Sequence, residues 1–135
     1  MVRYLIDTNI CIAWLKGESI IRDKFLVHSP QEITISTINL AELFFGAYNS
    51  EKVEHNLANL FDFVAELEII GLEFDSLKKY GELKANLRKK GKIIDEFDLL
   101  IASICLANGL VRVTNNEKHF SRIKKLKIEN WLKEE

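Results

Sequence analysis

The sequence predicts an α/β fold in which helices cover both faces of a central parallel sheet. Short segments of largely apolar, β-branched character alternate along the chain with longer amphipathic segments, an order typical of βαβ units. The predicted strands are continuously apolar, as expected for strands buried on both faces. The 135 residues include one proline and six scattered glycines, so the chain has no linker-like stretch and is expected to form one domain over residues 1–135.

Five segments have the composition of short strands. The first strand is expected at residues 2–6, and the second at residues 32–36, where a β-branched run follows a Ser-Pro turn. The third and fourth are expected at residues 67–70 and 110–114, and residues 126–129 are the candidate for a fifth. The sheet therefore has four to five strands.

Six segments have helical periodicity. They are expected at residues 9–15, 19–27, 39–48, 52–66, 72–90 and 95–107. Gly17, Gly91 and Gly109 follow three of them, as glycine commonly does at a helix C-terminus. The last helix is apolar nearly all round, so we expect it to be buried.

The net charge of −1 conceals two unlike halves. Residues 1–75 carry five Lys/Arg and twelve Asp/Glu, whereas residues 76–135 carry fourteen Lys/Arg and eight Asp/Glu. The densest basic stretch consists of Arg88, Lys89, Lys90 and Lys92, and a second consists of Arg122, Lys124, Lys125 and Lys127. These stretches are either solvated helix ends or contacts for a phosphate backbone.

Polar clusters lie where the predicted strands end, which is where open α/β sheets carry their active sites. The clusters are Asp7-Thr8-Asn9, Ser36 to Glu42, Asp95 with Asp98, and Thr114-Asn115-Asn116-Glu117. Taken singly, each has an ordinary explanation as a helix cap, a capping box (Asn39 with Glu42), a dipole-favoured acid or a turn. Taken together, Asp7, Glu42 and Asp98 bring three carboxylates from distant parts of the chain to one edge of the sheet.

Asp98 is the most informative of these acids because the helix that it begins has little polar face. A buried carboxylate is costly without a partner, and the nearest basic residues in sequence are Lys92 and Arg112, so no local partner is expected. Three neighbouring carboxylates need a cation, or at least one of them protonates. Oxygen ligands of this kind suit Mg²⁺ or Mn²⁺.

Other chemistries lack their motifs in this sequence. It has no Cys-x-x-Cys or His-x-x-x-His pair for zinc, and its two cysteines, Cys11 and Cys105, lie in apolar stretches without a neighbouring histidine. It also lacks the glycine-rich loops that bind nucleotide cofactors. Metal-assisted hydrolysis remains, most naturally of a phosphodiester.

The sequence resembles the PIN-domain family, and in particular its VapC group of bacterial and archaeal toxins. The resemblance covers essentially the whole chain and is carried by four motifs in order. They are the apolar run ending in Asp7-Thr8-Asn9, Ile38-Asn39-Leu40-Ala41-Glu42-Leu43, Asp98-Leu99-Leu100-Ile101-Ala102, and Val113-Thr114-Asn115-Asn116-Glu117-Lys118-His119-Phe120. The close of the chain, Leu126-Lys127-Ile128-Glu129-Asn130-Trp131, is also similar.

The resemblance implies a three-layer α/β/α sandwich and a Mg²⁺- or Mn²⁺-dependent endoribonuclease that inhibits translation, with tRNA as the favoured substrate. It also implies a cognate VapB-type antitoxin, a homodimer, and contact with DNA only through the antitoxin. Asp7, Glu42 and Asp98 match the acidic positions, with Asp7 and Asp98 as metal ligands and Glu42 binding directly or through water. Thr8, Asn9 and Thr114 are expected to support the site.

One position departs from the family pattern. Many members carry a fourth acid just after the fourth strand, where this chain has Asn116 with Glu117 beside it. Either residue is a candidate for the fourth position, and Asp95 is a candidate supporting carboxylate.

The predicted helices at residues 9–15 and 39–48 carry apolar residues that form either core or an antitoxin groove. They are Ile10, Ile12, Trp14, Leu40, Leu43, Phe44 and Phe45. The chain has no apolar run long enough to span a membrane and no signal-peptide pattern, so a cytoplasmic location is expected. The rival function is a non-catalytic module that binds RNA or protein. A phosphatase or phospho-acceptor domain is disfavoured, because Asn9 stands where the former needs an acid.

Overall fold

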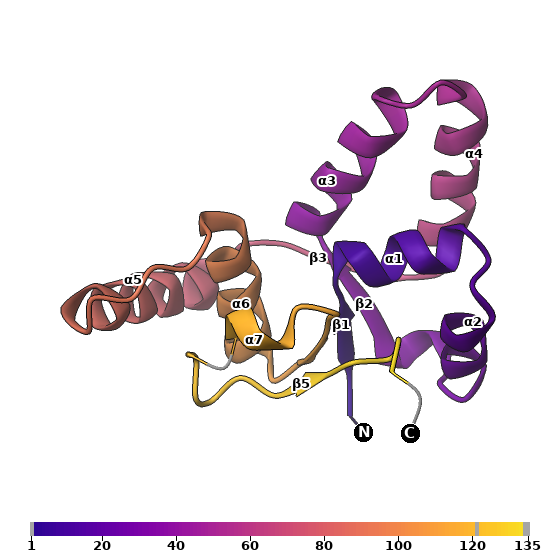
Figure 1. Cartoon of the computed structure of the whole chain (residues 1–135). Coiled ribbons are helices and arrows are strands. Elements are labelled where there is room, and N and C mark those ends of the chain that lie inside the picture. Colours follow the sequence, from indigo (N-terminus) through magenta and orange to yellow (C-terminus); the bar gives the residue numbers. More distant parts are fainter. Residues whose placement is uncertain (1, 121, 134–135) are drawn as a thin grey trace.

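Residues 2–120 and 122–133, which the computed structural model describes, contain a five-stranded parallel sheet with the strand order β3-β2-β1-β4-β5 (Figure 1). The strands are β1 (Tyr4–Ile6), β2 (Ile33–Ser36), β3 (Glu68–Ile70), β4 (Val111–Val113) and β5 (Ile128–Glu129). The central strand β1 pairs with β2 on one side and β4 on the other, with Tyr4 in register with Ile33 and Val111. The chain thus moves from β1 to one side of the sheet and later returns to the other, and ligands bind beside such reversals in open α/β sheets.

Helices cover both faces of this sheet, which confirms the predicted α/β/α layering (Figure 1). They are α1 (Thr8–Leu15), α2 (Ser19–Leu26), α3 (Thr37–Tyr48), α4 (Val53–Val64), α5 (Phe74–Lys89), α6 (Glu96–Asn108) and the short α7 (Glu117–Phe120), with a 3₁₀ turn at Pro30–Glu32. The six predicted helices are present with ends shifted by up to two residues. The short α7 was not predicted, and it directly follows the turn-like residues Thr114-Asn115-Asn116. None of the helices in the described ranges is both long and apolar enough to cross a membrane.

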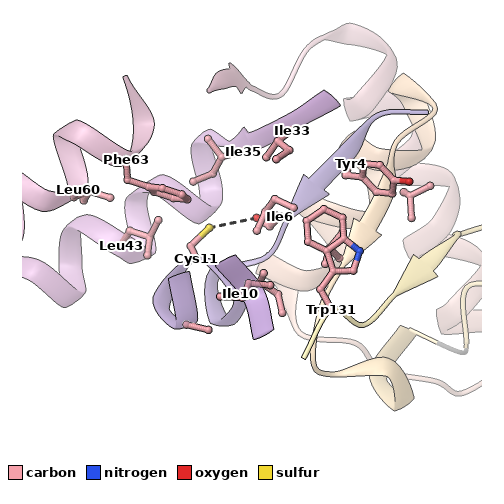
Figure 2. Packing of buried hydrophobic residues seen from close by; sticks show 14 residues of the cluster. Tyr4, Ile6, Ile10, Cys11, Ile33, Ile35, Leu43, Leu60, Phe63 and Trp131 are labelled. Atoms are coloured by element: carbon pink, nitrogen blue, oxygen red, sulfur yellow. Dashed lines mark hydrogen bonds between the residues drawn. The ribbon is translucent and has the colours of Figure 1, made fainter. Parts of the chain in front are cut away.

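Alternation of side chains along β1 divides the core between the two faces. Tyr4 and Ile6 join a cluster with residues of α1, α3 and α4, including Phe63, and with Trp131 near the C-terminus (Figure 2). Leu5 points to the opposite face and joins residues of α5 and α6. Cys11, in the first cluster, donates its thiol hydrogen to the Ile6 carbonyl at 3.7 Å (Figure 2). Both cysteines are buried and unpaired.

The start of α3 differs from the prediction in a way that affects the site. The helix begins at Thr37 and not at residue 39, because the Ser36 hydroxyl caps it by accepting a hydrogen bond from the Asn39 backbone N–H at 3.0 Å. The spacing of Asn39 and Glu42 is therefore not a capping box. The Asn39 side chain instead extends toward the end of β1.

Candidate active site

Asp7 lies directly after the central strand and caps α1. Its Oδ1 accepts hydrogen bonds from the Thr8 backbone N–H at 3.1 Å and from the Asn39 side-chain amide at 3.0 Å. The residue is 6% exposed. A carboxylate is stable in so buried a position only when hydrogen-bond donors or cations surround it. Two of the donors to Asp7 are Asn39 and Arg112, which follow it by 32 and 105 positions in the sequence.

Arg112, in the middle of β4, links Asp7 to Asp98. Its fully buried guanidinium donates from Nη2 to Asp7 Oδ2 at 3.0 Å and to Asp98 Oδ1 at 3.1 Å, while Nη1 donates to the Asp98 backbone carbonyl at 3.0 Å. Asp98 therefore has a basic partner, which lies 14 positions away in the sequence and is not a local one. The strand order places β4 beside β1 and brings this arginine to the acids. A lone arginine between Val111 and Val113 in an apolar strand was the available signal, because a buried guanidinium requires anionic partners.

Glu42, in α3, is tied to the same cluster through Thr8. The Thr8 hydroxyl donates to Glu42 Oε1 at 2.9 Å and accepts from Asn39 Nδ2 at 3.0 Å. Partial burial raises the pKa of Glu42, and the negative charges of Asp7 and Asp98 raise it further, whereas the Thr8 hydrogen bond opposes the shift. The structure thus brings together the three carboxylates that the sequence placed at one edge.

Asp98 lies in the first turn of α6 and is less enclosed than Asp7, since 23% of its side chain is exposed against 8% for Asp7. Burial raises the pKa of Asp98, with smaller contributions in the same direction from Asp7 and Asp95, while Arg112 acts in the opposite direction. Asp95 is exposed and caps α6, accepting hydrogen bonds from the backbone N–H groups of Phe97 and Asp98. Its effect on the site is electrostatic and indirect.

The segment after β4 contributes polar groups at the edge of the site. The buried Thr114 hydroxyl accepts from the Asn116 backbone N–H at 3.1 Å, and Asn9 Oδ1 accepts from the Asn115 backbone N–H at 3.3 Å. Asn116 itself is exposed.

Glu117, the other candidate for the fourth position, is held by the C-terminal segment. It accepts from Asn130 Nδ2 at 2.9 Å and pairs with Lys133 at 2.8 Å, and these two contacts lower its pKa. Its carboxylate therefore already has a hydrogen-bonded partner outside the acid cluster.

The two basic stretches meet in space although more than thirty positions separate them. Lys90 from the end of α5 lines a groove of about 310 Å³ together with Arg122, Lys124 and Lys125. Arg88 and Lys92 line a neighbouring cavity that reaches Glu96 in the first turn of α6. All four predicted basic residues of the first stretch, Arg88, Lys89, Lys90 and Lys92, are exposed.

The apolar residues of α1 and α3 divide between core and surface. Ile10 and Leu43 are buried, and Leu40, Phe44 and Trp14 pack partly buried against the core. Ile12 is 41% exposed and Phe45 is 70% exposed. Ile12 and Leu43 line a second groove of about 310 Å³ that also contains Glu42.

The donor chemistry of the acid cluster suits a hard divalent cation. Asp7, Glu42 and Asp98 offer carboxylate oxygens, and one oxygen each from Asp7 and Asp98 already converges on a single cationic nitrogen, Arg112 Nη2. As the described side chains stand, no three acidic, histidine or cysteine residues converge closely enough to hold a metal ion. The type of ligand atom, carboxylate oxygen, therefore suits a divalent metal ion, and Arg112 contacts two of the three expected ligands, Asp7 and Asp98.

Comparison with known proteins identifies the family. The model of the PIN domain matches residues 4–126. Ribonuclease VapC2 of Rickettsia felis is 42% identical over 132 residues, which cover 96% of this chain and 98% of that protein. The tRNA(fMet)-specific endonuclease VapC of Salmonella typhimurium is 36% identical over 132 residues, which cover 97% of this chain and 99% of that protein.

Solved structures agree with these relatives over the same length. The structure of DNA-bound VapBC from Salmonella typhimurium superposes with a TM-score of 0.90 at 36% identity, covering 97% of this chain and 99% of that one. That of VapBC2 from Rickettsia felis bound to a promoter DNA fragment gives a TM-score of 0.89 at 41% identity, with the same coverage. The chain therefore belongs to the PIN-domain family, within its VapC ribonucleases.

Proposed function

We propose that this ribonuclease is the toxin of a toxin–antitoxin pair and that it hydrolyses internal phosphodiester bonds of RNA in a reaction dependent on Mg²⁺ or Mn²⁺. The observation that carries the proposal is the convergence of Asp7 and Asp98 on one cationic nitrogen at the centre of the sheet, with Glu42 tied to them through Thr8. Such a concentration of acids suits a bound cation.

Each residue has a distinct part in this mechanism. Asp7 and Asp98 would hold the ion, and Glu42 would bind it directly or through a water molecule. When bound, the ion would activate water for attack and stabilise negative charge on the scissile phosphate. Asn39 and Thr8 fix the orientation of Asp7 and Glu42, while Asn9, Thr114 and Asn116 line the edge of the site and orient water or the phosphate. Asp95 adds negative charge from the α6 cap.

The substrate that we propose is tRNA. Two relatives, from Shigella flexneri and Salmonella typhimurium, are named tRNA(fMet)-specific endonucleases, at 33% and 36% identity to this chain. The groove in which Lys90 meets Arg122, Lys124 and Lys125 offers positive charge to a folded RNA backbone. Arg88, Lys89 and Lys92 extend that surface toward the start of α6.

The partner that we propose is a VapB-type antitoxin, through which the protein contacts DNA only indirectly. The structures from Salmonella typhimurium and Rickettsia felis are VapBC complexes bound to DNA. The groove containing Glu42 and the exposed Ile12 lies beside the acid cluster, so a partner segment seated there blocks access to the site. We further propose a homodimer, which light scattering of the purified protein tests directly.

A cleavage assay tests the proposed activity. Purified protein is incubated with a tRNA pool or with ribosomal RNA in Mg²⁺ or Mn²⁺, and the new RNA ends are sequenced. Asp7→Asn and Asp98→Asn are expected to abolish cleavage, and chelation of the metal is expected to do the same. Asp23→Asn, which neutralises an exposed acid in α2, is the matched control and is expected to cleave as the wild type does.

Two outcomes contradict the proposal. Cleavage by both Asp7→Asn and Asp98→Asn at the wild-type rate would remove these acids from the mechanism. RNA binding without any metal-dependent cleavage would favour the rival function, a non-catalytic binding module.

A further inference from the structure

We propose that Arg112 is an internal counter-ion of the acid cluster, whose Nη2 atom contacts Asp7 and Asp98, the two acids that would hold a divalent cation. Metal binding would then require this contact to be given up. The inference rests on the metal dependence proposed above and adds a competition between the ion and a residue of the chain itself.

The geometry of a single atom carries the proposal. Arg112 Nη2 lies 3.0 Å from Asp7 Oδ2 and 3.1 Å from Asp98 Oδ1. Mg²⁺ needs oxygen ligands at about 2.0–2.1 Å, closer than the nitrogen lies to either oxygen. A cation that took these two oxygens as ligands would meet the positive charge of the guanidinium beside them, so the ion and Nη2 would compete for the same acceptors.

Charge balance gives the contact its purpose in the metal-free protein. Without a cation, the negative charges of Asp7 and Asp98 repel each other in a largely buried part of the protein, where water screens them less than at the surface. The guanidinium of Arg112 has no exposed surface, so its charge must in turn be offset by those acids. The guanidinium and the two carboxylates thus stabilise one another in the metal-free protein, and a divalent ion would replace the guanidinium as the counter-ion of the acids.

The remaining contacts of Arg112 allow it to stay in place when Nη2 leaves the acids. Its guanidinium lies 3.7 Å from the centre of the Phe120 ring, and Nη1 donates to the Asp98 backbone carbonyl. Neither contact uses a carboxylate. Nε is buried and, within residues 2–120 and 122–133, has no hydrogen-bond partner, so the two acids do not satisfy the guanidinium completely.

An alternative role for Arg112 makes a different prediction. If Arg112 is a structural residue that keeps its hydrogen bonds to both acids, and the ion binds to other oxygens of the cluster, removing the guanidinium leaves metal affinity unchanged or weakens it. If Arg112 competes with the ion, removing the guanidinium strengthens metal binding. The sign of the change therefore separates the two roles.

A titration with Mn²⁺, followed by electron paramagnetic resonance of the free ion, measures that sign without reference to RNA cleavage. Arg112→Met removes the guanidinium and leaves an unbranched apolar side chain, so this variant is expected to bind Mn²⁺ about tenfold more tightly than the wild type. Arg22→Met is the matched control, because the Arg22 guanidinium also lies over an aromatic ring, that of Trp14, at 4.4 Å. It is expected to bind Mn²⁺ as the wild type does.

A second measurement uses the conservative variant, in case Arg112→Met does not fold. Arg112→Lys keeps the charge but loses the planar fork that spans both acids and the carbonyl, so its Mn²⁺ affinity is expected to lie above that of the wild type. Saturating Mn²⁺ should also raise the melting temperature of Arg112→Lys by more than that of the wild type.

The outcomes distinguish this inference from the proposed function. Equal Mn²⁺ affinity in wild type and the Arg112 variants, or weaker binding in the variants, overturns the counter-ion role and leaves metal-dependent cleavage intact. Absence of Mn²⁺ binding in every variant overturns both.

Discussion

Arg112 Nη2 donates to Asp7 Oδ2 at 3.0 Å, across the two strands at the centre of the sheet, from a position 105 residues later in the chain. The pair is buried on both sides, with the Asp7 side chain 8% exposed and that of Arg112 fully enclosed. The acid proposed for catalysis is therefore also a structural partner. Substitutions at the site consequently affect stability as well as cleavage.

Replacing Asp7 by Asn is expected to lower the free energy of unfolding of the metal-free protein by about 1–3 kcal/mol, because Arg112 loses a buried charged acceptor. Urea denaturation measures the change. Asp98→Asn is the comparison, and no loss is expected there because burial raises the pKa of Asp98, so folding disfavours its ionised form at neutral pH. An Asp7→Asn protein as stable as the wild type would show that the buried pair contributes nothing.

Replacing Asn39 by Ala is expected to reduce the rate of RNA cleavage about 10- to 100-fold, the range found for groups that orient a metal ligand. Asn39 is fully buried and its amide contacts both Asp7 and Thr8. Single-turnover kinetics provides the measurement. Asn56→Ala serves as control, because it removes from α4 a side-chain amide that donates to the Ser50 hydroxyl. An equal loss of cleavage rate in both variants would contradict a positioning role for Asn39.

Replacing Glu42 by Gln is expected to stabilise the metal-free protein at pH 7. The folded-state pKa of Glu42 is raised, chiefly by burial, so its protonated form is favoured by folding and this stability is lost as the pH rises through the folded pKa. Because Glu42 is only partly buried, solvent screening keeps the expected gain small, about 0.5 kcal/mol at neutral pH. The gain is expected to vanish below the ordinary glutamate pKa. Melting temperatures at pH 7 and pH 4 test it.

Glu96→Gln provides a control of opposite sign. Hydrogen bonds from Lys84 and Tyr80 lower the pKa of Glu96, so its contribution to stability is present at neutral pH and is lost as the pH falls through that lowered pKa. Glu96→Gln is therefore expected to destabilise at pH 7 and to become neutral in acid. The same direction of change in both variants would be inconsistent with the pKa shifts described here.

Replacing Lys90 and Lys124 by Gln is expected to weaken RNA binding and to flatten its dependence on salt. Both residues line the basic groove, and each phosphate contact that is lost reduces the slope of log affinity against log salt by about 0.7 for single-stranded regions. Fluorescence anisotropy at several salt concentrations measures the slope. Lys52→Gln, an exposed position before α4, is the control, and an unchanged slope in the double variant would exclude the groove as the RNA surface.

Local signals in the sequence were sufficient for the elements and for the edge on which the acids lie. Gly109 ends α6 with a left-handed backbone (φ 65°), and Asp95 caps its start, so the limits of this helix depend on residues at or next to its ends. Asp7 follows an apolar strand. Since the carboxyl ends of parallel strands lie at one edge of a sheet, the proximity of Asp7 to Glu42 and Asp98 could be predicted from the order of the elements alone.

The contacts that complete the site depend on strand order, which hydrophobic periodicity does not contain. Arg112 contacts Asp7 because β4 pairs with β1. Asn39 contacts Asp7 from the first turn of α3, which Ser36 caps at the end of β2, so that the helix begins two residues before the predicted start. Lys90 and Lys124 likewise meet through the packing of α5 against the segment that follows α7. The sequence by itself determined which acids gather at the sheet edge, because that depends on alternation and chain order. Tertiary structure decided which cation holds them, because a hydrogen bond across 105 positions is set by strand pairing and not by any local pattern.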